Sequence, residues 1–167
     1  VAAQRLVQFL LPNFRMAAST SGGASVVNIA SMYGMVIPDQ RIYSDSKSTN
    51  PPFYGASKAA LLQWTRYAAC EFGFENIRFN SISPGPFPST NVKQNNPEFV
   101  STLAGKVPMG RVGDAEELCG PVAFLLSSSS SFVSEAGSAG FIDTREVSSV
   151  AVHSPSAGRA SSAATQR

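Results

Sequence analysis

The chain has 167 residues, 43% of them hydrophobic, and a formal net charge of +2. A chain of this size and apolar content can bury one core, so we expect a single domain. Lysine and arginine form no block, which argues against nucleic acid as a partner. No run approaches the ~20 apolar residues of a membrane-spanning helix, and the N-terminus lacks a secretory signal pattern, so we expect a cytoplasmic protein with no membrane partner.

The first half of the chain is predicted to begin with a helix over residues 1–16, where apolar residues recur at helical spacing. A turn leads to a strand over residues 24–30, whose continuous apolar character is typical of a parallel strand covered on both faces. Residues 34–53 are rich in Pro, Asp, Ser, Lys and Asn and are predicted to form a loop. Loops of that length are uncommon unless they are functional or disordered.

The second half is predicted to alternate helices with one further strand. A long helix is expected over residues 54–72, a strand over 76–82 and a short helix over 95–103. The last helix is expected to start at Asp114, with Glu117 three residues later as the second half of a capping box. Strand–helix–strand alternation of this kind favours an α/β fold with a parallel sheet.

The composition changes after Val133. Ser, Ala and Gly make up 18 of the 34 residues in 134–167, and no apolar period is sustained. We therefore expect a domain over 1–133 and a tail over 134–167 that is disordered or out of frame. His153, the one histidine of the sequence, lies in that tail and receives no catalytic role.

Ser31, Tyr54 and Lys58 are candidates for acid/base chemistry on an alcohol or a carbonyl group. Ser31 directly follows the first predicted strand, and Tyr54 and Lys58 lie four residues apart near the start of a predicted helix. Residues with that spacing share one helix face, so the ammonium can lie close to the phenol and favour the phenolate. A phenol with a pKa below its ordinary value of ~10 exchanges protons more efficiently near neutral pH. A packed tyrosine beside a solvated lysine is the plain alternative.

These elements, in this order, resemble the short-chain dehydrogenase/reductase family. The matching segments are Val27-Asn28-Ile29-Ala30-Ser31-Met32-Tyr33-Gly34, Tyr54-Gly55-Ala56-Ser57-Lys58-Ala59-Ala60, Asn76-Ile77-Arg78-Phe79-Asn80-Ser81-Ile82-Ser83-Pro84-Gly85 and Pro108-Met109-Gly110-Arg111. The resemblance implies an incomplete, doubly wound parallel sheet of the Rossmann type, with its N-terminal strands missing. The chain would be the C-terminal portion of the family's domain, because it contains no Gly-rich turn for a dinucleotide pyrophosphate between a strand and a helix.

The resemblance also implies an activity, which is hydride transfer between NAD or NADP and a small alcohol or carbonyl substrate. Tyr54 would be the general acid/base, Ser31 would hydrogen-bond the substrate oxygen, and Lys58 would lower the pKa of Tyr54 and hold the nicotinamide ribose. Together with Tyr54 and Lys58, the cofactor contacts would be Ile29, Ala30, Pro84, Gly85, Pro86, Phe87 and Ser89. The full-length family enzyme would be a homo-oligomer. The isolated fragment is expected to show no turnover, because half of the family's cofactor site is missing from it. The alternative is a truncated, inactive chain that at most self-associates through its helices.

The 22 residues between Ser31 and Tyr54 are more than the family commonly uses. Asp39 and Arg41 lie in this segment, and we expect them to contact a polar, sugar-like or acidic substrate. Surface decoration is the alternative. No metal site is predicted, and Cys70 and Cys119 are expected to be buried thiols.

Overall fold

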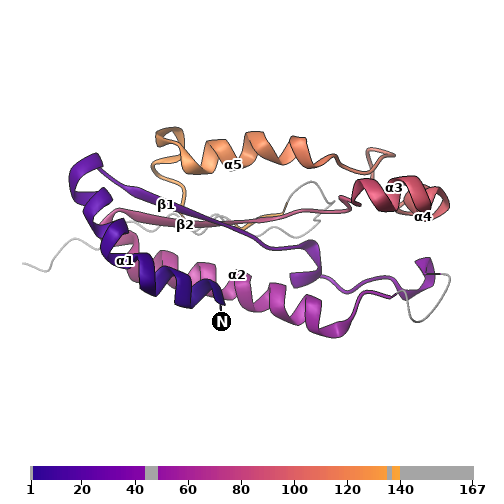
Figure 1. The fold of residues 1–167 in the computed structure, drawn as a ribbon, viewed down its shortest axis with the longest axis horizontal. Helices are drawn as coiled ribbons and strands as arrows, with labels where there is room; N and C mark the ends of the chain where they lie inside the picture. Colours follow the sequence, from indigo (N-terminus) through magenta and orange to yellow (C-terminus); the bar gives the residue numbers. More distant parts are fainter. Residues whose placement is uncertain (1, 44–48, 135–136, 140–167) are drawn as a thin grey trace, which may run out of the picture.

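The computed structural model describes residues 2–43, 49–134 and 137–139. Its centre is a parallel sheet in the order β1-β2-β3, formed by β1 (Ala24–Ile29), β2 (Ile77–Ser83) and β3 (Gly137–Ala139). The helices α1 (Ala2–Ser21) and α2 (Pro52–Phe72) lie on one side of the sheet, and α5 (Cys119–Leu126) lies on the other (Figure 1). The sheet is thus covered on both faces, which confirms the predicted α/β class.

The middle strand β2 is the most deeply buried element of the sheet. Six of its seven residues are buried, as expected for a strand with neighbours on both edges and helices on both faces. The main core cluster joins β2 to α1 and α2 through Val7, Ala68, Ala69, Phe72, Ile77 and Phe79. The rings of Phe72 and Phe79 pack with their centroids 5.7 Å apart. Phe72 is therefore part of the core of this chain.

Arg78 fastens α5 and the segment after it to the sheet. Its guanidinium donates to the carbonyl oxygens of Leu125, Ser127 and Val133 and to the Ser130 hydroxyl, at 3.0–3.2 Å. Burial lowers the pKa of this guanidinium from its ordinary value. The carbonyl partners satisfy its N–H donors, so a charged side chain can lie in the partly buried layer between sheet and helix.

The predicted elements differ from the observed ones mainly at their ends. The helix α1 extends to Ser21, and α2 begins at Pro52 because proline is well suited to the first turn of a helix. The helix expected over 95–103 is two helices, α3 (Thr90–Asn95) and α4 (Pro97–Ala104). They separate at Asn96, whose side chain accepts from the Phe99 N–H and caps α4.

Within the stretch predicted to be a disordered or out-of-frame tail, Gly137–Ala139 pair in parallel with β2, because the edge of a strand offers backbone groups to an extended segment beside it. Residues 135–136 and 140–167 lie outside the described residues. One further expectation requires correction. Cys70 and Cys119, expected to be buried, are exposed. Among the helices that the structure describes, none has both the length and the apolar character of a membrane-spanning segment.

The packing of β2 on α2 predicts how much stability one core ring supplies. Phe79 has 0% of its surface exposed, whereas Phe74, five residues away, has 83% exposed. Phe79→Ala should lower the free energy of unfolding by about 3–5 kcal/mol because it leaves a cavity. Phe74→Ala should change it by less than about 0.5 kcal/mol. Urea unfolding followed by circular dichroism measures both, and equal losses would contradict the assigned core.

Candidate functional site

The carboxyl ends of β1 and β2 lie side by side and place two predicted site segments together. The Ala30 N–H donates to the Ile82 carbonyl oxygen at 2.7 Å, and the Met32 N–H donates to the Pro84 carbonyl oxygen at 3.1 Å. The segment from Ile29 to Ser31 therefore runs beside the start of the loop that follows β2. Ligands of open α/β sheets bind outside the carboxyl ends of the strands, which is where this edge lies.

Ser31 lies at the first position after this edge and is buried. It caps a short 3-10 helix, Met32–Gly34, and its hydroxyl oxygen accepts from the Tyr33 N–H at 3.2 Å. That bond fixes the direction of the side chain and uses a lone pair. The hydroxyl can therefore still donate its proton to an oxygen of a bound molecule.

Tyr54 and Lys58 both lie in the first turns of α2, as predicted from their spacing. The Lys58 ammonium lies 5.7 Å from the centroid of the Tyr54 ring and donates to the Ile29 carbonyl oxygen at 2.8 Å. One lysine thus joins the helix that carries the phenol to the end of β1. An ammonium has three donors, so the bond to Ile29 leaves two for other acceptors.

Two glycines allow the turn after β1 to lie directly against α2. A Cβ atom at Gly34 would lie 2.8 Å from the backbone carbon of Lys58 and 2.9 Å from the nitrogen of Ala59. A Cβ atom at Gly55 would lie 2.8 Å from the carbonyl oxygen of Tyr33. All three distances are shorter than the contacts that real Cβ atoms make. Ser31 is therefore held next to the start of α2 by a close backbone contact that only glycine permits.

Tyr33 is a residue of this site that the sequence interpretation missed. Burial raises the pKa of Tyr33 above its ordinary value, and a hydrogen bond with the Tyr43 side chain and the charges of Tyr43 and Tyr54 raise it further. The Tyr33 phenol therefore lies near Tyr54 and stays protonated. The sequence signal that could have identified Tyr33 is its position, since it is an aromatic residue two positions after the candidate serine, Ser31.

The loop Pro84–Ser89, with its predicted cofactor contacts, is held by a second segment of chain. The Gly113 N–H donates to the Pro86 carbonyl oxygen at 3.0 Å. The Phe87 ring lies so close to Gly113 that a Cβ atom there would overlap it. At the end of the loop, the Ser89 hydroxyl caps α3 by accepting from the Val92 N–H at 3.4 Å. The loop is thus fixed at its middle and at its end.

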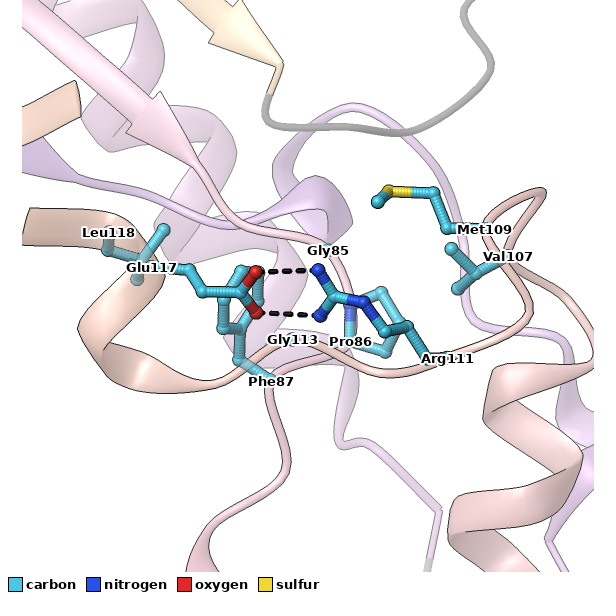
Figure 2. Close-up of a pocket in the computed structure, with 9 residues that line it drawn as sticks. All are labelled: Gly85, Pro86, Phe87, Val107, Met109, Arg111, Gly113, Glu117 and Leu118. Atoms are coloured by element: carbon cyan, nitrogen blue, oxygen red, sulfur yellow. Dashed lines mark hydrogen bonds and ion pairs between the residues drawn. The ribbon is translucent and has the colours of Figure 1, made fainter. Parts of the chain in front are cut away.

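A cavity of about 90 Å³ lies beside this loop (Figure 2). In Figure 2 the Glu117 carboxylate faces the Arg111 guanidinium, and the two make paired hydrogen bonds of 2.6 and 2.7 Å. Glu117 also accepts from the Asp114 N–H at 2.9 Å, which is its half of the predicted capping box. The bonds from Arg111, followed by that from Asp114, lower the pKa of Glu117 to about 2.

A larger cavity of about 190 Å³ lies between the segment after Ser31 and the end of α4. Its lining is mostly apolar and comprises Met32, Tyr33, Val36, Ile37, Asp39, Ile42, Pro86, Leu103, Lys106, Val107 and Pro108. Because Met32 and Tyr33 directly follow Ser31, this cavity opens next to the candidate catalytic residues.

Asp39 and Arg41, the predicted substrate residues, are brought together as an ion pair. The Asp39 carboxylate accepts from the Arg41 guanidinium at 2.8 and 3.0 Å and from the Lys106 ammonium at 3.2 Å. These bonds, led by those from Arg41, lower the pKa of Asp39 well below its ordinary value. Asp39 lines the larger cavity, whereas the Arg41 side chain is 87% exposed at its rim.

Comparisons with known proteins agree on one kind of relative. Residues 3–144 match the family model described as Enoyl-(Acyl carrier protein) reductase. The chain is 38% identical, over 67% of its length, to a rhamnolipids biosynthesis 3-oxoacyl-[acyl-carrier-protein] reductase of Pseudomonas aeruginosa, of which it covers 41%. It also superposes on a short chain dehydrogenase from Leptospira borgpetersenii with bound NAD+, with a TM-score of 0.63, 33% identity, and coverage of 77% and 48% of the two chains. The Pseudomonas aeruginosa RhlG/NADP active-site complex gives a TM-score of 0.65, again with 33% identity and coverage of 77% and 48%.

The chain spans less than half the length of each of these three relatives. The family match, over residues 3–144, contains the carboxyl ends of β1 and β2 and the helix α2 with Tyr54 and Lys58.

The close contact at Gly34 predicts that a single methyl group there is costly. Gly34→Ala should destabilise the chain by about 1–3 kcal/mol, because α2 and the turn after β1 must separate to admit the methyl group. The matched control is Gly73→Ala at the end of α2, where a Cβ atom meets nothing within 4 Å. The free energy of unfolding of that variant should lie within about 0.5 kcal/mol of the wild-type value. Thermal unfolding measures both, and a neutral Gly34→Ala would contradict the contact.

The pair of Glu117 with Arg111 predicts a dependence of stability on pH. The native pKa of Glu117 is about 2, below its ordinary value of 4.5, so the native state takes up this proton later than the unfolded state. The stabilisation of the native state by the ionised Glu117 carboxylate is complete above pH 4.5 and is lost as the pH falls towards 2. Melting temperatures should therefore fall less over this range for Glu117→Gln than for wild type. The melting temperature of Glu116→Gln, which leaves the pair intact, should fall as much as that of wild type. Parallel curves of melting temperature against pH for all three proteins would contradict the lowered pKa of Glu117.

Proposed function

Because the chain belongs to the short-chain dehydrogenase/reductase family, we propose that it supplies the catalytic residues of an NAD(P)-dependent oxidoreductase. Its reaction transfers hydride between a nicotinamide cofactor and an alcohol or carbonyl substrate, with Tyr54 as general acid/base. The observation that carries this proposal is the position of Lys58, whose ammonium lies by the Tyr54 ring and hydrogen-bonds the end of β1.

The nicotinamide and ribose end of the cofactor fits the residues at the strand ends. Ile29 and Ala30 lie beside the loop after β2, and Lys58 keeps two donors for ribose hydroxyls once it has bonded to Ile29. Within Pro84–Ser89, the residues with a backbone N–H are Gly85, Phe87 and Ser89, because proline has none. NAD and NADP are both proposed, since one solved relative has NAD+ bound and another is an NADP complex.

The proposed mechanism needs two hydroxyl groups and one ammonium from this chain. When bound, the cofactor supplies the hydride in reduction and accepts it in oxidation. In reduction, the Tyr54 hydroxyl gives its proton to the substrate oxygen as the carbonyl carbon gains hydride, and in oxidation the proton returns. The Ser31 hydroxyl donates to the same oxygen and stabilises the charge that develops there. The Lys58 ammonium stabilises the Tyr54 phenolate that remains after proton transfer.

Asp39 and Arg41 are proposed to contact a polar group of the substrate. Asp39 lines the larger cavity, which opens beside the segment after Ser31, and Arg41 is hydrogen-bonded to Asp39. Because Asp39 already binds Arg41 and Lys106, any polar group of the substrate must fit around these ion pairs.

A second candidate is a chain that self-associates through its helices without catalysis. Leu6, Phe9 and Met16 lie on α1 at spacings that share a helix face, and all three are largely exposed. Exposed apolar side chains grouped on one face of a helix are typical of an interaction surface. The same face supports our proposal that the full-length form is a homo-oligomer.

Substitution of Tyr54 tests the proposed chemistry. In the full-length protein, Tyr54→Phe should lower kcat at least about 100-fold for reduction of a small ketone, because it removes only the hydroxyl that transfers the proton. Tyr67→Phe, an exposed tyrosine on the same helix, should retain wild-type turnover. Turnover is followed by the absorbance of the reduced dinucleotide. Equal rates for both variants would overturn the role of Tyr54.

A dinucleotide titration of the chain separates the two candidate functions. Binding with turnover supports the oxidoreductase. No binding, together with oligomers that grow with protein concentration in sedimentation, supports the non-catalytic alternative.

A further inference from the structure

The rim of the larger cavity carries more positive than negative charge. Asp39 contributes one carboxylate, whereas Arg41 and Lys106, which both bond to it, contribute two cations. Among the described residues that line the cavity, Asp39 and Lys106 are the charged ones. One positive charge is therefore left uncompensated in this three-residue group.

The wall of the cavity, in contrast, is apolar. Met32, Val36 and Ile37 form one side, and Leu103 and Val107 form the other. Ile37 is 90% exposed, so a ligand that covers it removes apolar surface from water. The cavity thus favours a hydrocarbon body, and its rim favours an anion.

We propose that this cavity selects an oxo or hydroxy compound with an apolar body and an anionic group, such as an oxo acid, and that Lys106 and Arg41 receive the anion. Asp39 is the internal counter-ion that holds the two cations at the rim. This inference rests on the proposed function and deepens it by naming the substrate class. It also divides the expected roles of Asp39 and Arg41, because the guanidinium binds the substrate and the carboxylate competes with it.

The position of the cavity relative to the catalytic residues supports this assignment. Met32 and Tyr33 line it and directly follow Ser31, and Pro86 lines it from the loop after β2. A bound molecule can therefore place its carbonyl group at Ser31 and Tyr54 and extend its body along the apolar wall. Its anionic group then meets Lys106 and Arg41, whose side chains are 57% and 87% exposed. Arginine binds a carboxylate through two parallel hydrogen bonds, which strengthens the contact.

The test compares two ligands of equal shape and different charge. We would measure binding of oxo-octanoate, with its ketone next to the terminal methyl group, and of the matching oxo-octanamide by calorimetry without dinucleotide. The acid should bind about tenfold more tightly than the amide, as expected for one added charge-assisted contact. Lys106→Met should remove most of this preference. Arg66→Met, which removes the same charge from an exposed position on α2, should retain it.

Asp39→Asn gives the sharpest outcome because it separates the two roles. Asparagine keeps the capping ability of aspartate at the start of the short helix Gln40–Ile42. If Asp39 is a counter-ion, the variant should bind the acid several-fold more tightly, because Lys106 and Arg41 lose their competing partner. If Asp39 is itself a ligand of the substrate, the variant should bind more weakly, and our proposal is wrong.

Three other results would also overturn the proposal: equal binding of acid and amide, equal effects of Lys106→Met and Arg66→Met, and no binding of either ligand. Each is distinct from a failure of the proposed function, which is judged by Tyr54→Phe on a small uncharged ketone. A Tyr54-dependent enzyme without acid preference keeps the function and loses this inference. A chain that prefers the acid but shows no Tyr54-dependent turnover keeps this inference and loses the proposed function.

Discussion

The contact between the turn after β1 and the start of α2 is the constraint on which the rest of the site depends. At Gly34 and Gly55 the two backbones approach so closely that a Cβ atom would lie 2.8 Å from a backbone atom of the other segment. Through this contact Ser31, which follows a strand, and Tyr54, which lies on a helix, come to the same edge of the sheet. The proposed catalytic residues Ser31 and Tyr54 are therefore brought together by packing, because no hydrogen bond links Ser31 to Tyr54 among those found in the described residues.

Ion pairs then hold the segments that surround this edge. Asp39 with Lys106 connects the segment after Ser31 to the end of α4, and Lys93 with Asp114 connects α3 to the chain that holds the loop after β2. Exposed pairs of this kind contribute little to the free energy of unfolding. Their effect is on position, because each one limits where a loop beside the cavities can move. The loops at the site are thus restrained by charge, whereas the sheet below them is restrained by burial.

The parts of this arrangement that could be predicted from sequence are those set by local spacing. Tyr54 and Lys58 share a face because they are four residues apart on a helix, and β1 and β2 are recognisable because a strand covered on both faces is continuously apolar. The approach of Gly34 to α2 could not be predicted, since it depends on residues more than 20 positions away. The pairing of Gly137–Ala139 with β2 was missed for a related reason. These residues have no apolar pattern of their own, and their pairing depends on the edge of β2, which is distant in sequence. The boundary between α3 and α4 at Asn96 depends on local sequence, since Asn96 and Pro97 form a typical helix start. It was missed because the apolar residues on both sides continue at helical spacing.

The neighbouring phenols of this site have different partners. Tyr33 is half-buried and hydrogen-bonds the Tyr43 side chain, and its burial, followed by that bond, raises the pKa of Tyr33 above its ordinary value. Tyr54 instead has the Lys58 ammonium 5.7 Å from the centroid of its ring. Proton exchange with a substrate near neutral pH requires a group that is not held in its protonated form. Of the two phenols we therefore propose Tyr54 for that role, because its neighbour is an ammonium and not a second phenol.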